Sequence, residues 1–177
     1  MKLRWLAIGL CATLGACAEV TPPEPPPPPQ VAARPQPGFQ PSEFAWSTER
    51  GSATVRGLVD YAQGGRHYAC AGQVVLTPDA PYSRRRILQL YGSSEHADLP
   101  VDEVRSRQAN RPSDDYSAYV KKQGCDAGGR FVFSGLPAGG WFVIVVVSDS
   151  SGGNAPAIAL MRRVETRPGA VRTIVLQ

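Results

Sequence analysis

From residue 52 onward, apolar and polar positions alternate in several short runs. In TVRGLVDY (54–61), every second position from Val55 to Tyr61 carries an apolar side chain or glycine, and Arg56 and Asp60 fall on the opposite side. A period of two is typical of a strand with one buried face. The same reasoning predicts further strands for the runs QVVLTP (73–78), RFVFSGL (130–136), AIALMRRVET (157–166) and VRTIVLQ (171–177).

Two runs depart from this alternation. WFVIVVV (141–147) is apolar throughout and mostly β-branched, which predicts a central strand buried on both faces. YSRRRILQLYG (82–92) repeats its apolar residues at helical spacing, with Ser83 to cap the helix and Gly92 to end it. Glycine-rich turns separate the runs, so the pattern predicts an all-β sandwich with one short helix.

Charge adds little to this picture. The chain has 177 residues and a formal net charge of +4, and its only basic run is RRR (84–86). We interpret that run as the solvated face of a helical turn. A nucleic-acid-binding protein would carry a denser basic patch with interleaved aromatic residues, so nucleic acid is not an expected partner. Residues 52–177 are enough for one compact domain.

The N-terminus has the form of a secretory signal. Two basic residues precede WLAIGLCATL (5–14), which has no charge and is too short to span a membrane as a helix. The overlapping stretch LGAC (14–17) resembles the lipobox of bacterial lipoproteins. That resemblance implies a lipid on Cys17 and, because Ala18 follows, a place in the outer membrane, with the domain in the periplasm or at the cell surface. The alternative is a plain signal peptide with an incidental cysteine.

A proline-rich stretch comes next. Ten of the 20 positions from Pro22 to Pro41 are proline, and such segments take an extended polyproline II conformation. We interpret residues 17–51 as a lipid-anchored linker between the signal peptide (1–16) and the domain (52–177). The alternative is a docking peptide for a domain that reads proline-rich segments.

Two of the four cysteines belong to the predicted domain, Cys70 and Cys125. In an oxidising compartment a disulfide between them is the expected use, and two independent buried thiols are the alternative. No metal site is expected, because neither cysteine has a C-x-x-C partner and His67 and His96 lack ligand spacing. No cofactor is expected either.

The stretch CDAGGRFVFSGLPAGGWFVIV (125–145) resembles the signature of carboxypeptidase regulatory-like domains, D-x-x-G-x-F-x-F-x-x-L-P-x-G-x-Y. VRGLV (55–59) and AGQVVLTP (71–78) fit the first two strands of that family. The resemblance covers residues 52–177 and implies a prealbumin-like, seven-stranded Greek-key sandwich. Here Gly140 is an extra residue in the turn and Trp141 replaces the usual tyrosine. We interpret Trp141 as a core residue rather than a platform for a ligand.

This resemblance implies a fold more than an activity. The sequence has no H-x-x-E motif of the zinc carboxypeptidases, and it ends in TIVLQ rather than in the tetrapeptide of transthyretin-type hydrolases. Its two histidines lie in polar surroundings and do not suggest a Ser/His/Asp arrangement. We therefore predict that the protein is not an enzyme.

One long segment, residues 93–116, is charged and has few core-forming positions. Loops of this length inside a domain are usually functional or disordered. A partner-binding loop is one interpretation and a solvated loop another. Calcium binding by its carboxylates is a third, although no calcium-binding spacing is present. Shortening such a loop is expected to leave stability nearly unchanged. The candidate partner-binding residues are Glu95, Asp98, Asp102, Glu103, Arg105, Arg107, Asp114 and Asp115.

Two classes of function remain open. The first is a non-catalytic, lipid-anchored protein of the cell envelope, whose sandwich contacts another envelope protein or supports an assembly. The alternative is a carbohydrate-binding module, which we expect to carry a row of exposed aromatic residues at strand spacing. The tyrosines outside the expected core are scattered over loops and edges, which weakens this alternative. They are Tyr68, Tyr82, Tyr116 and Tyr119.

Overall fold

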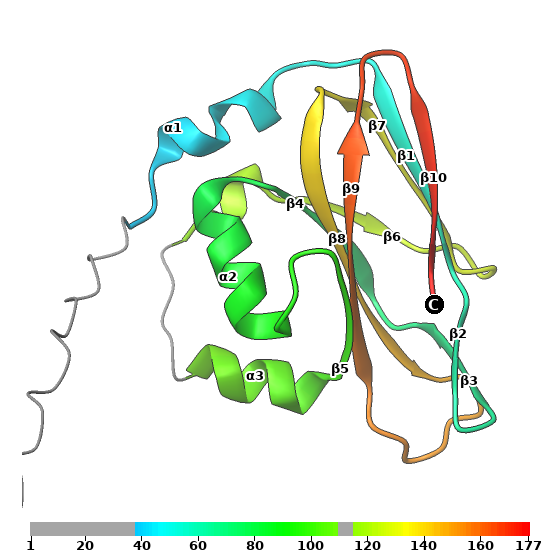
Figure 1. Ribbon diagram of the computed structural model, residues 1–177. Helices are drawn as coiled ribbons and strands as arrows, with labels where there is room; N and C mark the ends of the chain where they lie inside the picture. The colour runs from blue at the N-terminus through cyan, green and yellow to red at the C-terminus, as the bar shows by residue number, and fades with distance from the viewer. Residues whose placement is uncertain (1–37, 110–114) are drawn as a thin grey trace, which may run out of the picture. The chain divides into compact units, whose positions relative to one another are not determined.

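The computed structural model describes residues 38–109 and 115–177. The predicted signal peptide, Cys17, most of the linker and Asp114 lie outside these ranges. Figure 1 shows the elements, which in chain order are α1 (Pro41–Phe44), η1 (Ala45–Thr48), β1 (Ala53–Val59), β2 (Tyr61–Gln63), β3 (Arg66–Cys70), β4 (Gln73–Pro78), α2 (Pro81–Tyr91), β5 (His96–Pro100), α3 (Val101–Ala109), η2 (Ser117–Tyr119), β6 (Lys121–Gly124), β7 (Arg130–Leu136), β8 (Gly139–Asp149), β9 (Ile158–Thr166) and β10 (Val171–Leu176).

The strands form two sheets. In the smaller sheet, β1 lies between β10, which runs parallel to it, and β7, which runs antiparallel. In the larger sheet, β8 pairs with β9 along one edge and with β3 and β4 along the other. β5 adds to β9, β6 to β4 and β2 to β3. The apolar rows of the two sheets meet in one core that includes Val55, Leu76, Phe131 and Trp141. The prediction of an all-β sandwich is therefore confirmed.

β8 is buried on both faces, as its continuous apolar sequence predicts. Trp141 and Val143 belong to the core between the sheets, whereas Phe142 packs on the opposite face with Met161 of β9 and Ile87 of α2. In Figure 1, α2 and α3 lie on this outer side of the larger sheet. The described part of the chain thus adds a helical layer to the sandwich, where the sequence predicts a single short helix.

The described residues contain ten strands rather than the predicted seven. One reason is a break in the chain direction at Gly72, whose φ of 106° is favourable only for glycine. This break separates β3 from β4, although both pair with the same edge of β8. β2 and β6 are further short pieces, with three and four residues, at the borders of the larger sheet.

α2 forms where the sequence predicts a helix. The Ser83 hydroxyl accepts a hydrogen bond from the Ala80 N–H (2.9 Å), and Gly92 ends the helix in the left-handed conformation, its N–H donating to the Leu88 carbonyl (2.9 Å). The basic run 84–86 is not fully solvated, which corrects our interpretation. Arg86 is only 5% exposed, because it follows Ser83 by one turn and shares the buried side of the helix.

Residues 93–116 are not one long loop, which corrects the sequence-based interpretation. β5 extends the larger sheet by pairing with β9, and α3 follows directly. Leu99, Val101 and Val104 pack against the cluster that Phe142 and Ile87 form beneath α2. This segment therefore contributes packing and strand pairing, so its removal is expected to destabilise the domain.

The folded domain also begins earlier than predicted. Residues 41–48 fall within the predicted linker, but they form α1 and η1. Phe44 is fully buried, and the ring of Trp46 lies edge-on to that of Trp141 with a centroid distance of 5.1 Å. These two aromatic side chains attach the segment to the sandwich. No helix among the described residues has the length and apolar character needed to span a membrane.

Cys70 and Cys125 form a disulfide, with their Cα atoms 6.4 Å apart, which confirms the predicted pair. Cys70 is the last residue of β3, and Cys125 follows β6 at the point where the chain leaves the larger sheet for β7 of the smaller one. The bond therefore fixes the crossing between the two sheets. Both cysteine side chains are half-buried and pack against the main core.

Candidate functional site

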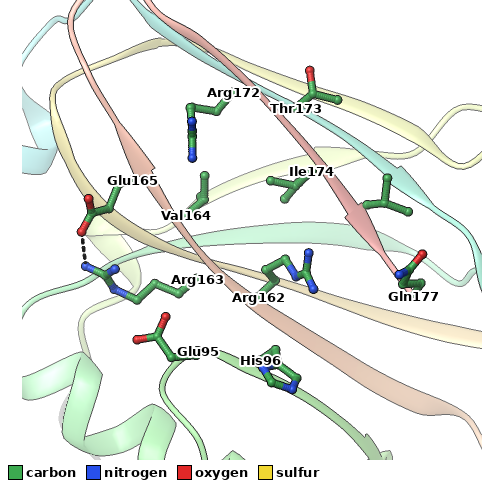
Figure 2. A pocket seen from close by; sticks show the side chains of 11 residues that line it. Glu95, His96, Arg162, Arg163, Val164, Glu165, Arg172, Thr173, Ile174 and Gln177 are labelled. Atoms are coloured by element: carbon green, nitrogen blue, oxygen red, sulfur yellow. Dashed lines mark hydrogen bonds and ion pairs between the residues drawn. The ribbon is translucent and has the colours of Figure 1, made fainter.

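The two sheets leave an open seam between β9 and β10. β9 is paired with β5 only as far as Arg162, so its last residues have a free edge, and β10 pairs with β1 alone. A cavity of about 670 Å³ lies between these edges (Figure 2). We call it the seam groove, and it is lined by residues 162–165 of β9, residues 172–175 of β10, Gln177, Glu95 and His96.

The seam groove is polar because two strands place arginine where their pattern requires an apolar side chain. In β9, Leu160 and Val164 face the core, and Arg162 lies between them in the same row. In β10, Ile174 and Leu176 face the core, and Arg172 precedes them in that row. Figure 2 shows both arginines projecting into the space between the strands. His96 lies opposite Arg162 in the β5–β9 register.

Arg163 has a different role, because its side chain points to the other face of β9. Its Nε donates to Asp79 Oδ2 (2.6 Å) and its Nη2 donates to Glu165 Oε1 (2.8 Å). Asp79 is almost completely buried and also accepts a hydrogen bond from the Nε of Arg84 in α2 (2.7 Å). Although burial opposes it, hydrogen bonding to Asp79 and Glu165 raises the pKa of Arg163. Arg163 therefore stays charged and ties β9 to the start of α2.

The free edge of β10 adds backbone groups to the groove. The carbonyls of Ala170 and Leu176 accept hydrogen bonds from the N–H groups of Thr54 and Asp60, both at 2.9 Å. Since backbone groups alternate in direction along a strand, the even-numbered residues of β10 face β1 and the odd-numbered ones face the groove. Thr173 therefore presents its N–H and C=O there, beside the side chains of Arg162, Arg172 and Gln177.

The structure does not gather the predicted partner-binding residues into one site. Glu95 lies at the seam groove. Asp98 lies elsewhere, in β5, where it accepts a hydrogen bond from the hydroxyl of Tyr61, the first residue of β2 (3.1 Å). Burial and this hydrogen bond raise the pKa of Tyr61 to about 12. Asp115 accepts the Ser117 N–H (2.9 Å), which lowers the pKa of that carboxyl.

The other predicted residues bond within α3. Arg105 lies 3.3 Å from Asp102, and Arg107 donates to Glu103 (2.5 Å) and to the Leu90 carbonyl of α2 (2.7 Å). These charges stabilise α3 and its contact with α2. In residues 38–109 and 115–177, no group of three or more His, Cys, Asp and Glu side chains could hold a metal ion.

The tyrosines are not scattered, which corrects another interpretation. Tyr68 is buried against Tyr61, with ring centroids 5.4 Å apart. Three others cluster with two phenylalanines near α1, and all centroid distances between neighbours lie between 5.2 and 6.1 Å. The members of this cluster are Phe39, Phe44, Tyr82, Tyr116 and Tyr119. The rings pack against one another, mostly tilted or edge-on, so they do not form a row that could stack on sugar rings.

Sequence reasoning missed the seam groove, although a signal for it was present. Arg162 interrupts the apolar row Ile158, Leu160 and Val164, and Arg172 stands at the head of another. A charged residue in a row that otherwise faces the core marks either an edge or a binding site. The sequence does not show that the two interruptions line the same groove.

Among solved structures, the chain is similar in fold to a carbohydrate-binding candidate. The crystal structure of a "putative carbohydrate binding protein" from Pseudomonas aeruginosa matches with a TM-score of 0.52 and 21% sequence identity, over 79% of this chain and 97% of that chain. No protein-family description and no curated protein matches the sequence. At this identity the similarity supports the β-sandwich fold.

Proposed function

We propose that this chain is a non-catalytic, lipid-anchored binding module of the cell envelope, and that its seam groove binds a carbohydrate. The observation that carries the proposal is the polar lining of the groove at positions that face the core elsewhere along the same strands. Polar side chains at these positions cannot extend the core between the two sheets. They can instead form hydrogen bonds with a polar ligand. The name of the structural neighbour supports the same class of ligand.

The chemistry of the groove suits sugar hydroxyls. Arg162, Arg172 and Gln177 supply hydrogen-bond donors, and Glu95 and Glu165 supply acceptors. A hydroxyl both donates and accepts, so it can bond with both kinds of group at once. The volume of about 670 Å³ lies within the range of ligand pockets and is large enough for more than one sugar unit.

A protein partner remains the second candidate, because the free edge of β10 could pair with an extended segment of another chain. The residues of 93–116 no longer favour this function, since most of those that the structure describes bond within α3 or to neighbouring strands. Carbohydrate binding is therefore the better-supported proposal.

A glycan array probed with the full-length protein tests the function. We expect binding to a subset of glycans, and we expect Arg172→Trp, which fills the groove with an indole ring, to abolish it. The control is Arg56→Trp, on the exposed face of β1 in the same sheet. The proposal would be refuted by a protein that binds no glycan, or by glycan binding that Arg172→Trp leaves intact.

The anchor is tested separately. Cys17→Ser removes the thiol to which the lipid would be attached, so we expect the variant to lose palmitate labelling and to leave the membrane fraction. A variant that stays in the membrane fraction and still incorporates palmitate would show that Cys17 is not the lipid site.

A further inference from the structure

We propose that the ligand of the seam groove is an acidic carbohydrate, an oligosaccharide whose negatively charged groups bind Arg162 and Arg172. This inference rests on the proposed carbohydrate-binding function and names its ligand class. Three observations support it: the charge balance of the groove, the position of the two arginines, and the continuation of the groove along the seam.

The charge balance separates the arginines into two kinds. Arg163 is compensated by Asp79 and Glu165 at 2.6 and 2.8 Å. Arg162 and Arg172 form no ion pair with any residue that the structure describes. Of the two carboxylates that line the groove, Glu165 is the one bound to Arg163. Among the side chains, two arginines therefore face the groove against one remaining carboxylate.

The position of Arg162 also favours a bound anion. Its side chain lies half-buried between Leu160 and Val164, where an apolar residue would extend the core. A guanidinium group that is withdrawn from water without a partner is destabilising, and an anion in the groove would remove that cost. The planar donors of arginine fit the two oxygens of a carboxylate or sulfate group.

The groove continues along the seam in both directions. Glu165 and Arg172 also line a hollow of about 260 Å³ with Arg167, at the turn between β9 and β10. Arg162 and Gln177 line a smaller hollow toward β5. Because the hollows share residues, the polar strip extends beyond the seam groove and presents Arg162, Arg172 and Arg167, while Asp98 at its β5 end already accepts a hydrogen bond from Tyr61. An oligomer with repeated negative charges fits this strip better than a single neutral sugar does.

Calorimetry on the full-length protein with matched ligands tests the inference. We expect binding of oligogalacturonate, whose units each carry a carboxylate, and no binding of its methyl ester, in which the charge is removed. Arg162→Gln and Arg172→Gln should each weaken binding roughly tenfold, since charged hydrogen bonds contribute at this level. Arg56→Gln, on the exposed face of β1, is the control and should bind like the parent protein. Affinity should fall as salt is raised from 0.1 to 1 M. Dextran sulfate compared with dextran shows whether sulfate can replace carboxylate.

Several results would overturn the inference in distinguishable ways. Equal binding of the ester and the acid would show that the groove takes neutral sugars, and the proposed function would stand without the acidic ligand. Equal competition by polyglutamate would assign the groove to an acidic peptide. Unchanged binding by both glutamine variants would show that the two arginines do not bind the ligand. If these variants also aggregate, the role of the arginines is to protect the sheet edges. Failure of every carbohydrate to bind would remove the proposed function itself. Urea denaturation of each variant shows that it is folded.

Discussion

Replacing Cys70 and Cys125 with serine tests how much of the stability depends on one covalent link. The disulfide closes a loop of 55 residues. In the chain-entropy model, a loop of this length restricts the unfolded chain by about 4 kcal/mol. A domain of this size typically has about 5–15 kcal/mol of total stability. We therefore expect the double serine variant to lose a large part of its free energy of unfolding.

The structure also predicts where the loss appears first. β6 has four residues, three of them exposed, and it pairs with β4 alone. The disulfide holds the end of β6 through Cys125, so without the bond this strand has only its ladder to β4. We expect the β6 amides that donate to β4 to lose protection from hydrogen exchange before those of β8, which is paired along both edges.

The measurement is urea denaturation of the parent protein and the double serine variant, each with and without a reducing agent. The reducing agent should destabilise the parent protein to the level of the variant and leave the variant unchanged. Loss of less than about 1 kcal/mol, with β6 equally protected in both proteins, would refute the reasoning. It would mean that the unfolded chain is already compact enough for the link to restrict little.

Three further changes test the fold. Trp141→Ala should cost about 3–5 kcal/mol in urea denaturation, because Trp141 is fully buried against Trp46; a loss below 1 kcal/mol would place it outside the core. Tyr61 has a folded-state pKa of about 12 against an ordinary 10, so its protonated phenol stabilises the fold below pH 10 and this contribution is lost as the pH rises to 12. Tyr61→Phe should reduce that alkaline decline in stability, leaving the share of Tyr91, whose pKa burial also raises to about 12, and an unchanged decline would contradict the assignment. Replacing residues 96–109 by a short Gly/Ser turn should broaden or abolish cooperative unfolding, since it removes β5 and α3; full stability would restore the loop interpretation.

The strands that the sequence predicts well are those whose own residues specify them. The sequence of β8 alone predicts a central strand, because a run of seven apolar residues indicates burial on both faces. β1 and β7 show alternation, and Gly57 fits beneath the ring of Phe131, whose atoms a Cβ at that position would meet at 1.9 Å. α2 has both its capping residues. In each case local pattern and tertiary environment agree.

The elements that the sequence misses depend on neighbours that are distant in the chain. β5 alternates over only five residues, and its polar side chains, His96 and Asp98, outweigh that signal. α3 has no buried residue and lies on the protein through a narrow contact. The seam groove depends on Arg162 and Arg172 coming together from strands of two different sheets. Two strands joined by a short turn commonly pair with each other, and nothing local shows that β10 pairs with β1 instead.

The pairing of β10 with β1 also has a consequence for how the chain folds. The N–H of Gly169 donates to the hydroxyl of Ser52 across 117 residues, at the point where the two strands begin to pair. Until β10 is in place, β1 has one bare edge and Leu176 is missing from the core. A contact between such distant segments closes a long loop, and folding is slow where such contacts dominate. The smaller sheet is therefore expected to be completed late in folding. A chain that ends before β10 would keep the edge of β1 unpaired and would lack Leu176 in the core.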